Sequence, residues 1–243
     1  MLRTLLLLSI TSTLTACSTT RSDRFGYEPQ SVDRDQLPAR IAFGSCADQE
    51  QPQPILREVV SRDPELFIYL GDNVYGDTED MNVLEGKYRT LAARPEFQEL
   101  REHCTTLAIW DDHDYGANDA GSEYPGRKAS REVFLDFWRE PAVSPRREHP
   151  GIYHAERFEE GGRTLQVLLL DTRSFRDPLV ANGEVPDPPF KNQYRPNPDR
   201  SADLLGGEQW RWLEAQLREP ADLRIIATSI QFGHSYNGWE SWT

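Results

Sequence analysis

The sequence predicts an α/β fold, and three short apolar runs are the main evidence. The runs Arg40–Phe43, Leu66–Leu70 and Thr105–Trp110 are each followed by a polar loop. Short apolar runs bounded by turn signals are typical of buried strands. Apolar residues at helical spacing over about Pro54–Ser61 place a helix between the first two runs. This strand–helix–strand order predicts neighbouring parallel strands whose following loops meet at one edge of a sheet.

The rest of the chain continues this alternation of helices and strands. Apolar spacing predicts further helices over 82–93, shortly after Pro95, over 129–140 and over about 208–218. Two strands, Ile152–Phe158 and Arg163–Leu170, flank Gly161-Gly162, which is a hairpin signal. A last strand is expected at Arg224–Thr228. The segment 177–200 is rich in Pro and Asn and is expected to form a long surface loop.

The first residues have the pattern of an export signal. A positive charge in Met1–Arg3 precedes an apolar stretch, Leu5–Leu14, that is too short to span a bilayer stably. The ending Leu14–Cys17 resembles a bacterial lipoprotein box, so we expect a signal peptide over 1–16 and a lipid anchor on Cys17. An ordinary signal cut nearby, with Cys17 incidental, is the alternative.

The expected anchor implies a place in the cell and a domain division. A serine after the cysteine resembles the bacterial pattern for sorting to the outer membrane, so we expect an exported outer-membrane or cell-envelope lipoprotein bound to the membrane through its N-terminal lipid. Residues 17–39 are polar and are expected to be a linker, followed by one domain over 40–243.

Charge and cysteine content exclude some functions. The chain has 243 residues, is 37% hydrophobic and carries a formal net charge of -13. An acidic surface repels phosphate backbones, so nucleic-acid binding is not expected. Export would permit a disulfide between Cys46 and Cys104, but their contexts differ and we do not predict one.

Metal-binding side chains gather at the predicted strand ends. Cys46, Asp72, Asp112 and His113 lie at or just beyond three strands, and Tyr75 lies one turn further. Because these ends share an edge, we expect Cys46 and Asp72 to meet. A carboxylate can bridge two metals, and thiolate with phenolate would neutralise ferric iron. His113 could then protonate a leaving alkoxide. Each residue also has an ordinary structural explanation, so the joint placement carries the prediction.

Five motifs in order resemble one enzyme family. They are Phe43–Cys46, Gly71–Tyr75, Trp110–Gly116, Leu170–Arg173 and Leu205–Trp210. From about Arg40 onward the chain resembles the alkaline phosphatase D (PhoD-like) branch of the calcineurin-like metallophosphoesterases. The resemblance implies a four-layer αββα sandwich, iron and calcium as metals, and hydrolysis of phosphomonoesters or phosphodiesters.

The same resemblance implies a role for each site residue. Cys46 and Tyr75 would bind iron, and Asp72 would bridge iron and calcium. Asp112 takes the place of an asparagine that binds the second metal and a phosphate oxygen, and His113 that of the catalytic histidine after it. Arg173 would contact the substrate phosphate or, equally, form a structural ion pair.

The chain departs from the family pattern after residues 238–242. No Gly-Asp-x-His motif follows, although the family draws further metal ligands from it. We therefore expect a domain that is incomplete at the C-terminus, with weak metal retention and little turnover. A phospholipase D-type phosphodiesterase and an inactive, truncated lipoprotein that only binds ligand are the alternatives to a phosphatase.

Overall fold

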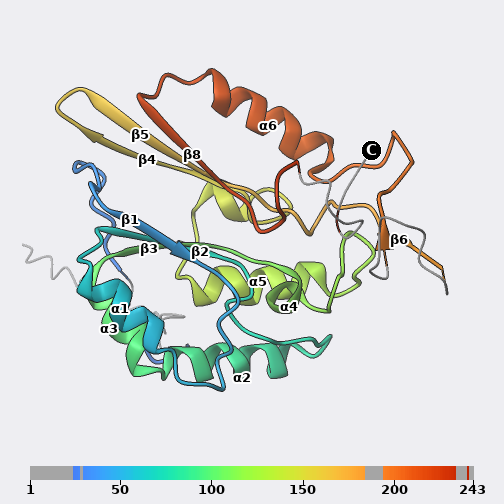
Figure 1. Cartoon of the computed structure of the whole chain (residues 1–243), viewed down its shortest axis with the longest axis horizontal. Coiled ribbons are helices and arrows are strands. Elements are labelled where there is room, and N and C mark those ends of the chain that lie inside the picture. Colours follow the sequence, from blue (N-terminus) through green and yellow to red (C-terminus); the bar gives the residue numbers. More distant parts are fainter. Residues whose placement is uncertain (1–23, 28–29, 184–193, 234–239, 241–243) are drawn as a thin grey trace, which may run out of the picture.

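Two three-stranded β-sheets lie face to face at the centre of the molecule (Figure 1). The structure, a computed structural model, describes the chain except for residues 1–23, 28–29, 184–193, 234–239 and 241–243. The first sheet has the order β1 (Ile41–Gly44), β2 (Leu66–Leu70), β3 (Thr105–Ile109), and all its strands run parallel. The pairing of β1 with β2 confirms the parallel neighbours predicted from the strand–helix–strand order.

The second sheet has the order β4–β5–β8. Strands β4 (His154–Glu160) and β5 (Arg163–Leu169) pair antiparallel, which confirms the predicted hairpin. Strand β8 (Leu223–Ala227) pairs parallel with β5. A small separate pair, β6 (Val180–Ala181) with β7 (Tyr194–Arg195), lies within the segment expected to be one long loop.

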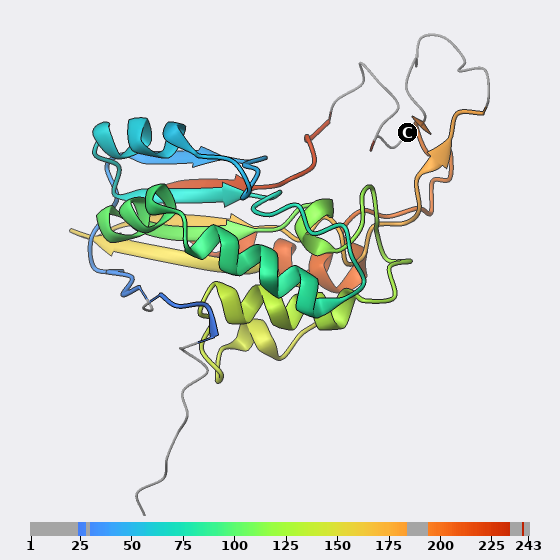
Figure 2. The same cartoon turned by 90° about the horizontal axis from the view of Figure 1, so that it is seen from below.

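Helices cover the outer face of each sheet (Figure 1; Figure 2). The first sheet is accompanied by α1 (Pro54–Ser61), α2 (Met81–Ala92), α3 (Pro95–His103) and α5 (Arg127–Phe137). Helix α6 (Gly206–Arg218) covers the second sheet. A 3₁₀ turn (Pro145–Arg147) links α5 to the second sheet. The expected helices are therefore all present, with boundaries displaced by at most three residues.

The alternation of side chains along β5 explains how the layers are held together. Leu165, Val167 and Leu169 face the main core, which also contains residues of β2 and β3. Leu168 and Leu170 face the opposite way and pack against α6 through Leu213. Burial on both faces fits the nearly continuous apolar run of this strand.

The segment expected to be a linker packs in part on the domain. Phe25 is 4% exposed, and its ring meets that of Phe137 edge-on at 5.2 Å. Gln30 donates a hydrogen bond to the carbonyl of Arg101, and Arg34 pairs with Glu156. Figure 2 shows this segment (blue) running back along the domain. A single aromatic residue such as Phe25 has no periodicity, so the sequence pattern did not reveal its burial.

The short helix α4 (Asp112–Tyr115) forms where a loop was expected. Asp111 and Asp114 cap it reciprocally: the side chain of each residue accepts a hydrogen bond from the backbone N–H of the other. Within the part of the chain that the structure describes, no helix has the length and apolar character needed to cross a membrane. The expected signal peptide and Cys17 lie outside the described residues.

Candidate metal centre

The loops after β1 and β2 bring Cys46 and Asp72 together. The Cys46 amide donates to the carbonyl of Gly71 at 3.2 Å, and the Ala47 amide to that of Asp72 at 3.3 Å. The Cys46 thiol then lies 3.5 Å from Oδ2 of Asp72. This confirms the contact predicted from the shared sheet edge. Both residues have positive φ, 60° at Cys46 and 50° at Asp72, a strained backbone that commonly marks functional sites.

Gly71 permits a close approach between the loops after β2 and β3. Its φ is +103°, and a Cβ there would lie 2.5 Å from Cβ of Asp111 and 2.9 Å from the backbone of Trp110. Only glycine fits this conformation and this space. The residue before Asp72 thus sets how near the Asp72 loop comes to Asp111 and Asp112.

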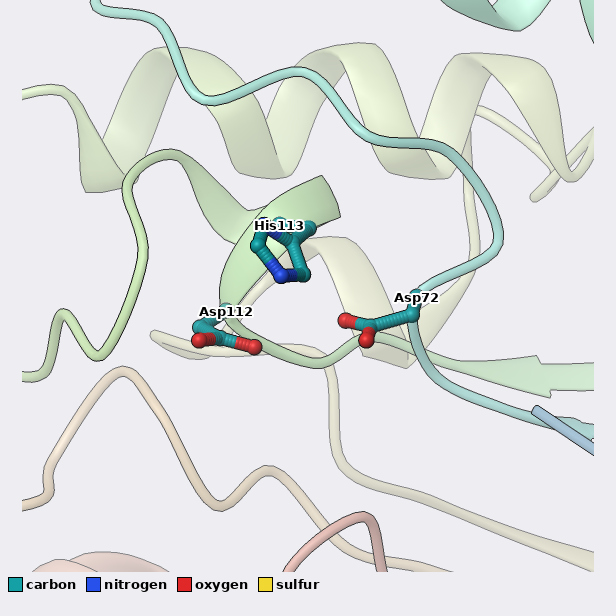
Figure 3. A group of neighbouring side chains, drawn as sticks. All are labelled: Asp72, Asp112 and His113. Carbon is teal, nitrogen blue, oxygen red and sulfur yellow. The ribbon is translucent and has the colours of Figure 1, made fainter. Parts of the chain in front are cut away.

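Asp72, Asp112 and His113 converge on one point (Figure 3). Each offers one possible ligand atom, and these atoms lie within 4.8 Å of one another. Oδ1 of Asp72 is buried and has no hydrogen-bond partner among the described residues. A buried carboxylate oxygen without a partner is costly unless a cation satisfies it. The two carboxylates suit divalent and trivalent metal ions, and the imidazole beside them can ligate a metal or, when protonated, donate a proton.

Tyr75 and Cys46 extend this group on the side of Asp72. The Tyr75 side chain lies near the Cys46 thiol and the Asp72 carboxylate. Burial, with the nearby charge of Asp72, raises the pKa of Tyr75 well above its usual range, and burial likewise raises that of the Cys46 thiol. A bound metal ion reverses this trend, because its charge favours thiolate and phenolate. The donors therefore fit a site that is completed by a cation.

The carboxylates of the centre differ in acidity. Burial, reinforced by the charges of Asp111 and Asp112, raises the pKa of Asp72 to about 6. Burial also opposes ionisation of Asp112, but the Arg173 guanidinium and the Asp119 amide outweigh it and lower the pKa of Asp112. At neutral pH both groups are available as anionic ligands.

His113 is held by Asp77, a residue that the motif analysis did not single out. Nδ1 of His113 lies 2.7 Å from Oδ1 and 2.9 Å from Oδ2 of Asp77. Nε2 is therefore the ring nitrogen that Asp77 does not contact. Burial lowers the pKa of His113, but the hydrogen bond that it donates to Asp77 and the charges of Asp112 and Asp72 raise it overall. The Tyr75 ring packs on the imidazole at 4.4 Å between centroids.

Arg173 is placed as an ion-pair partner of the site. Its side chain is 1% exposed, and Nη2 lies 2.5 Å from Oδ1 of Asp111 and 3.7 Å from Oδ1 of Asp112. Nη1 lies 2.5 Å from Oε1 of Glu240. Of the two roles expected for Arg173, these contacts correspond to the structural ion pair.

Two more residues hold the centre from behind. The Asp119 amide donates to Oδ2 of Asp112 at 2.7 Å, and the buried Asp114 carboxylate accepts the amides of Asn73 and Asp111 at 3.3 and 2.7 Å. Asp114 belongs to the Trp110–Gly116 motif. Asp77 and Asp119 lie outside the five motifs, and turns with a positive φ, 43° at Asp77 and 59° at Asp119, position them. Their only sequence signal was acidic loop composition.

Comparisons with known proteins agree with this fold. The sequence profile of the PhoD-like phosphatase family matches residues 41–242. A solved structure described as "Structure of PhoD" superposes with a TM-score of 0.63 at 18% identity, over 84% of this chain and 44% of that one. The chain thus spans less than half the length of that relative. A search of curated proteins finds no match. Because the family profile covers most of the sequence, the chain belongs to the PhoD-like phosphatases.

Proposed function

We propose that the protein is a metal-dependent hydrolase of phosphomonoesters or phosphodiesters, with its centre at Asp72, Asp112 and His113. The observation that carries this proposal is the convergence of these three side chains around a carboxylate oxygen that has no partner among the described residues. Membership of the PhoD-like family supplies the reaction class. The same membership supports the four-layer αββα sandwich as the architecture of the complete domain.

Iron and calcium are the proposed metals. Cys46, whose thiol contacts Asp72, and the nearby Tyr75 would hold iron, and Asp72 would bridge to calcium at Asp112. Thiolate and phenolate are anionic donors that suit iron, whereas carboxylate oxygens also suit calcium. When bound, such metals lower the pKa of water and stabilise charge on phosphoryl oxygens.

The chain's own residues would orient the substrate and move the proton. Asp77 accepts the proton on Nδ1 of His113 and so orients the ring, and the raised pKa of His113 favours the imidazolium, in which Nε2 also carries a proton for the leaving oxygen. The Asp119 amide and Arg173 keep Asp112 ionised and oriented. We assign Arg173 the structural ion pair, and no direct contact with the substrate is part of this proposal.

Hydrolysis of a chromogenic phosphomonoester and a chromogenic phosphodiester tests the function. The full chain, supplied with ferric iron and calcium, is expected to release product, and Asp72→Asn is expected to lower the rate by at least about 100-fold. Tyr75→Phe should abolish a visible charge-transfer band without unfolding the protein. Equal rates for wild type and Asp72→Asn would refute the metal centre proposed here.

We also propose that the protein is an exported lipoprotein anchored through Cys17. The support is the sequence pattern of Leu14–Cys17 alone. Labelled fatty acid supplied to producing cells should enter the wild-type chain and not Cys17→Ser, whereas label in both would contradict the assignment. This experiment is independent of the catalytic proposal.

A further inference from the structure

We propose that Asp114 is a positioning residue: its buried carboxylate joins the two loops that carry Asp72 and Asp112 and so sets the separation of these ligands. The inference rests on the proposed metal centre. Asp114 itself is not among the residues that converge on the metal position, so its effect would be exerted through its neighbours.

The contacts of Asp114 reach both loops. Oδ2 accepts hydrogen bonds from the backbone amide of Asn73 at 3.3 Å and from its side-chain Nδ2 at 2.5 Å. Oδ1 accepts the amide of Asp111 at 2.7 Å. Asn73 directly follows Asp72, and Asp111 directly precedes Asp112. One carboxylate therefore binds the residue adjacent to each proposed ligand.

Two further contacts fix Asp114 and Asn73 in the core. Tyr88 of α2 donates its hydroxyl to Oδ2 at 3.4 Å, and Nδ2 of Asn73 also donates to the carbonyl of Ile109 at the end of β3. Asp114 and Tyr88 are both fully buried at 0% exposure. Asp114 and Asn73 are thus held by contacts with a helix and a strand, and water does not compete for their hydrogen bonds.

The chemistry of the four donors makes a carboxylate necessary. The three N–H groups can only donate, and they lie on both oxygens of Asp114. In Asp114→Asn one oxygen becomes an NH₂ group. If the amide oxygen faces Asn73, the NH₂ group meets the Asp111 amide; if it faces Asp111, the NH₂ group meets both donors of Asn73. Either orientation releases one of the two loops.

A purely structural role would look different. A buried cap that only stabilises the fold would lower stability when changed, but metal affinity of the folded protein would stay the same. Positioning instead predicts a loss of affinity beyond what global stability explains. Residues that orient metal ligands typically contribute about 10–100-fold in affinity.

The test uses the full chain, Mn²⁺ as the probe and the electron paramagnetic resonance signal of free Mn²⁺ as the readout. Asp114→Asn is expected to bind Mn²⁺ about 10–100-fold more weakly than wild type. Tyr88→Phe removes only the longest hydrogen bond and should stay within about threefold. Leu100→Ala, a cavity in α3 away from the site, destabilises the fold and should leave affinity within about twofold.

Hydrogen exchange of backbone amides supplies a second measurement that needs no metal. In Asp114→Asn the amide of Asn73 or of Asp111 is expected to exchange at least about tenfold faster relative to the core amide of Ile68. Unchanged protection, or faster exchange with Mn²⁺ affinity unchanged, overturns the positioning role. Wild-type protein that binds no Mn²⁺ overturns the metal centre and, with it, the inference about ligand spacing. The two failures are thereby separate outcomes.

Discussion

Replacing Asp77 by asparagine tests whether His113 is the proton donor of the proposed reaction. The variant keeps the size of the side chain and can still accept one hydrogen bond from Nδ1, but it removes the negative charge 2.7 Å away. A bound metal ion would offset the charges of Asp72 and Asp112 that act on His113. Asp77 instead contacts Nδ1 of His113 directly. The Asp77 contribution should therefore persist in the loaded enzyme.

The partial exposure of the His113–Asp77 pair predicts a small effect on stability, whereas its role in orienting the imidazole predicts a larger effect on turnover. The side chains of His113 and Asp77 are 20% and 44% exposed. A pair this accessible contributes at most about 1 kcal/mol to the free energy of unfolding. Orientation of a reacting imidazole matters more, so turnover of Asp77→Asn should fall roughly 10–100-fold.

The pH dependence gives this prediction a sign. Because the folded protein raises the pKa of His113, the protonated form stabilises the fold below the unfolded value of about 6.5. That contribution disappears as pH rises through the folded pKa. Asp77→Asn should therefore lose more stability at pH 5.5 than at pH 9, and the alkaline limb of its rate profile should move to lower pH.

Two measurements check these expectations. Urea unfolding at both pH values gives the stability change, and the rate of phosphoester hydrolysis between pH 5 and 10 gives the profile. A variant with wild-type turnover and an unmoved alkaline limb would refute the role of Asp77 in orienting His113. Asp80→Asn, an acid that caps α2 in the same polar loop, is a suitable control.

Three further changes probe the site and the fold. Mn²⁺ affinity should fall as pH drops through about 6, because protons then compete for Asp72; calorimetric titration at pH 5 and 7.5 measures this, and equal affinities would contradict it. Gly71→Ala should cost at least about 2 kcal/mol more in urea unfolding than Gly161→Ala, which has positive φ but no neighbour within 4 Å. Phe25→Ala should cost about 3–5 kcal/mol, whereas a free linker residue would cost almost nothing.

The strand ends were predictable because several independent signals coincide there. Apolar runs identify the strands, and the rule for parallel crossovers then brings their following loops to one edge. This was enough to place Cys46 beside Asp72 without any knowledge of side-chain conformation. Helix boundaries were less accurate, because propensity changes little over one turn and capping interactions decide the ends.

The residues that support the site were not predictable in the same way. Asp77 and Asp119 act through backbone turns with positive φ, and no periodic pattern encodes such turns. The roles of Asp114 and Arg173 depend on which donors face them in three dimensions. Phe25 is buried although its neighbours are polar, because a single aromatic side chain suffices to fill a gap against Phe137.

The adjacent residues Asp111 and Asp112 show how the ion pair of Arg173 contributes to the proposed metal centre. Oδ1 of Asp111 accepts from both Nε and Nη2 of Arg173, at 2.6 and 2.5 Å, so this oxygen is occupied by the protein. Asp112 receives only a longer contact of 3.7 Å and the Asp119 amide, which leaves capacity for a metal ion. Without Arg173, the half-buried carboxylate of Asp111 and the buried carboxylate of Asp112 would repel each other and Asp72, and one would take up a proton. In the proposed centre, the buried Arg173 would therefore keep Asp112 ionised as a metal ligand without itself contacting the substrate.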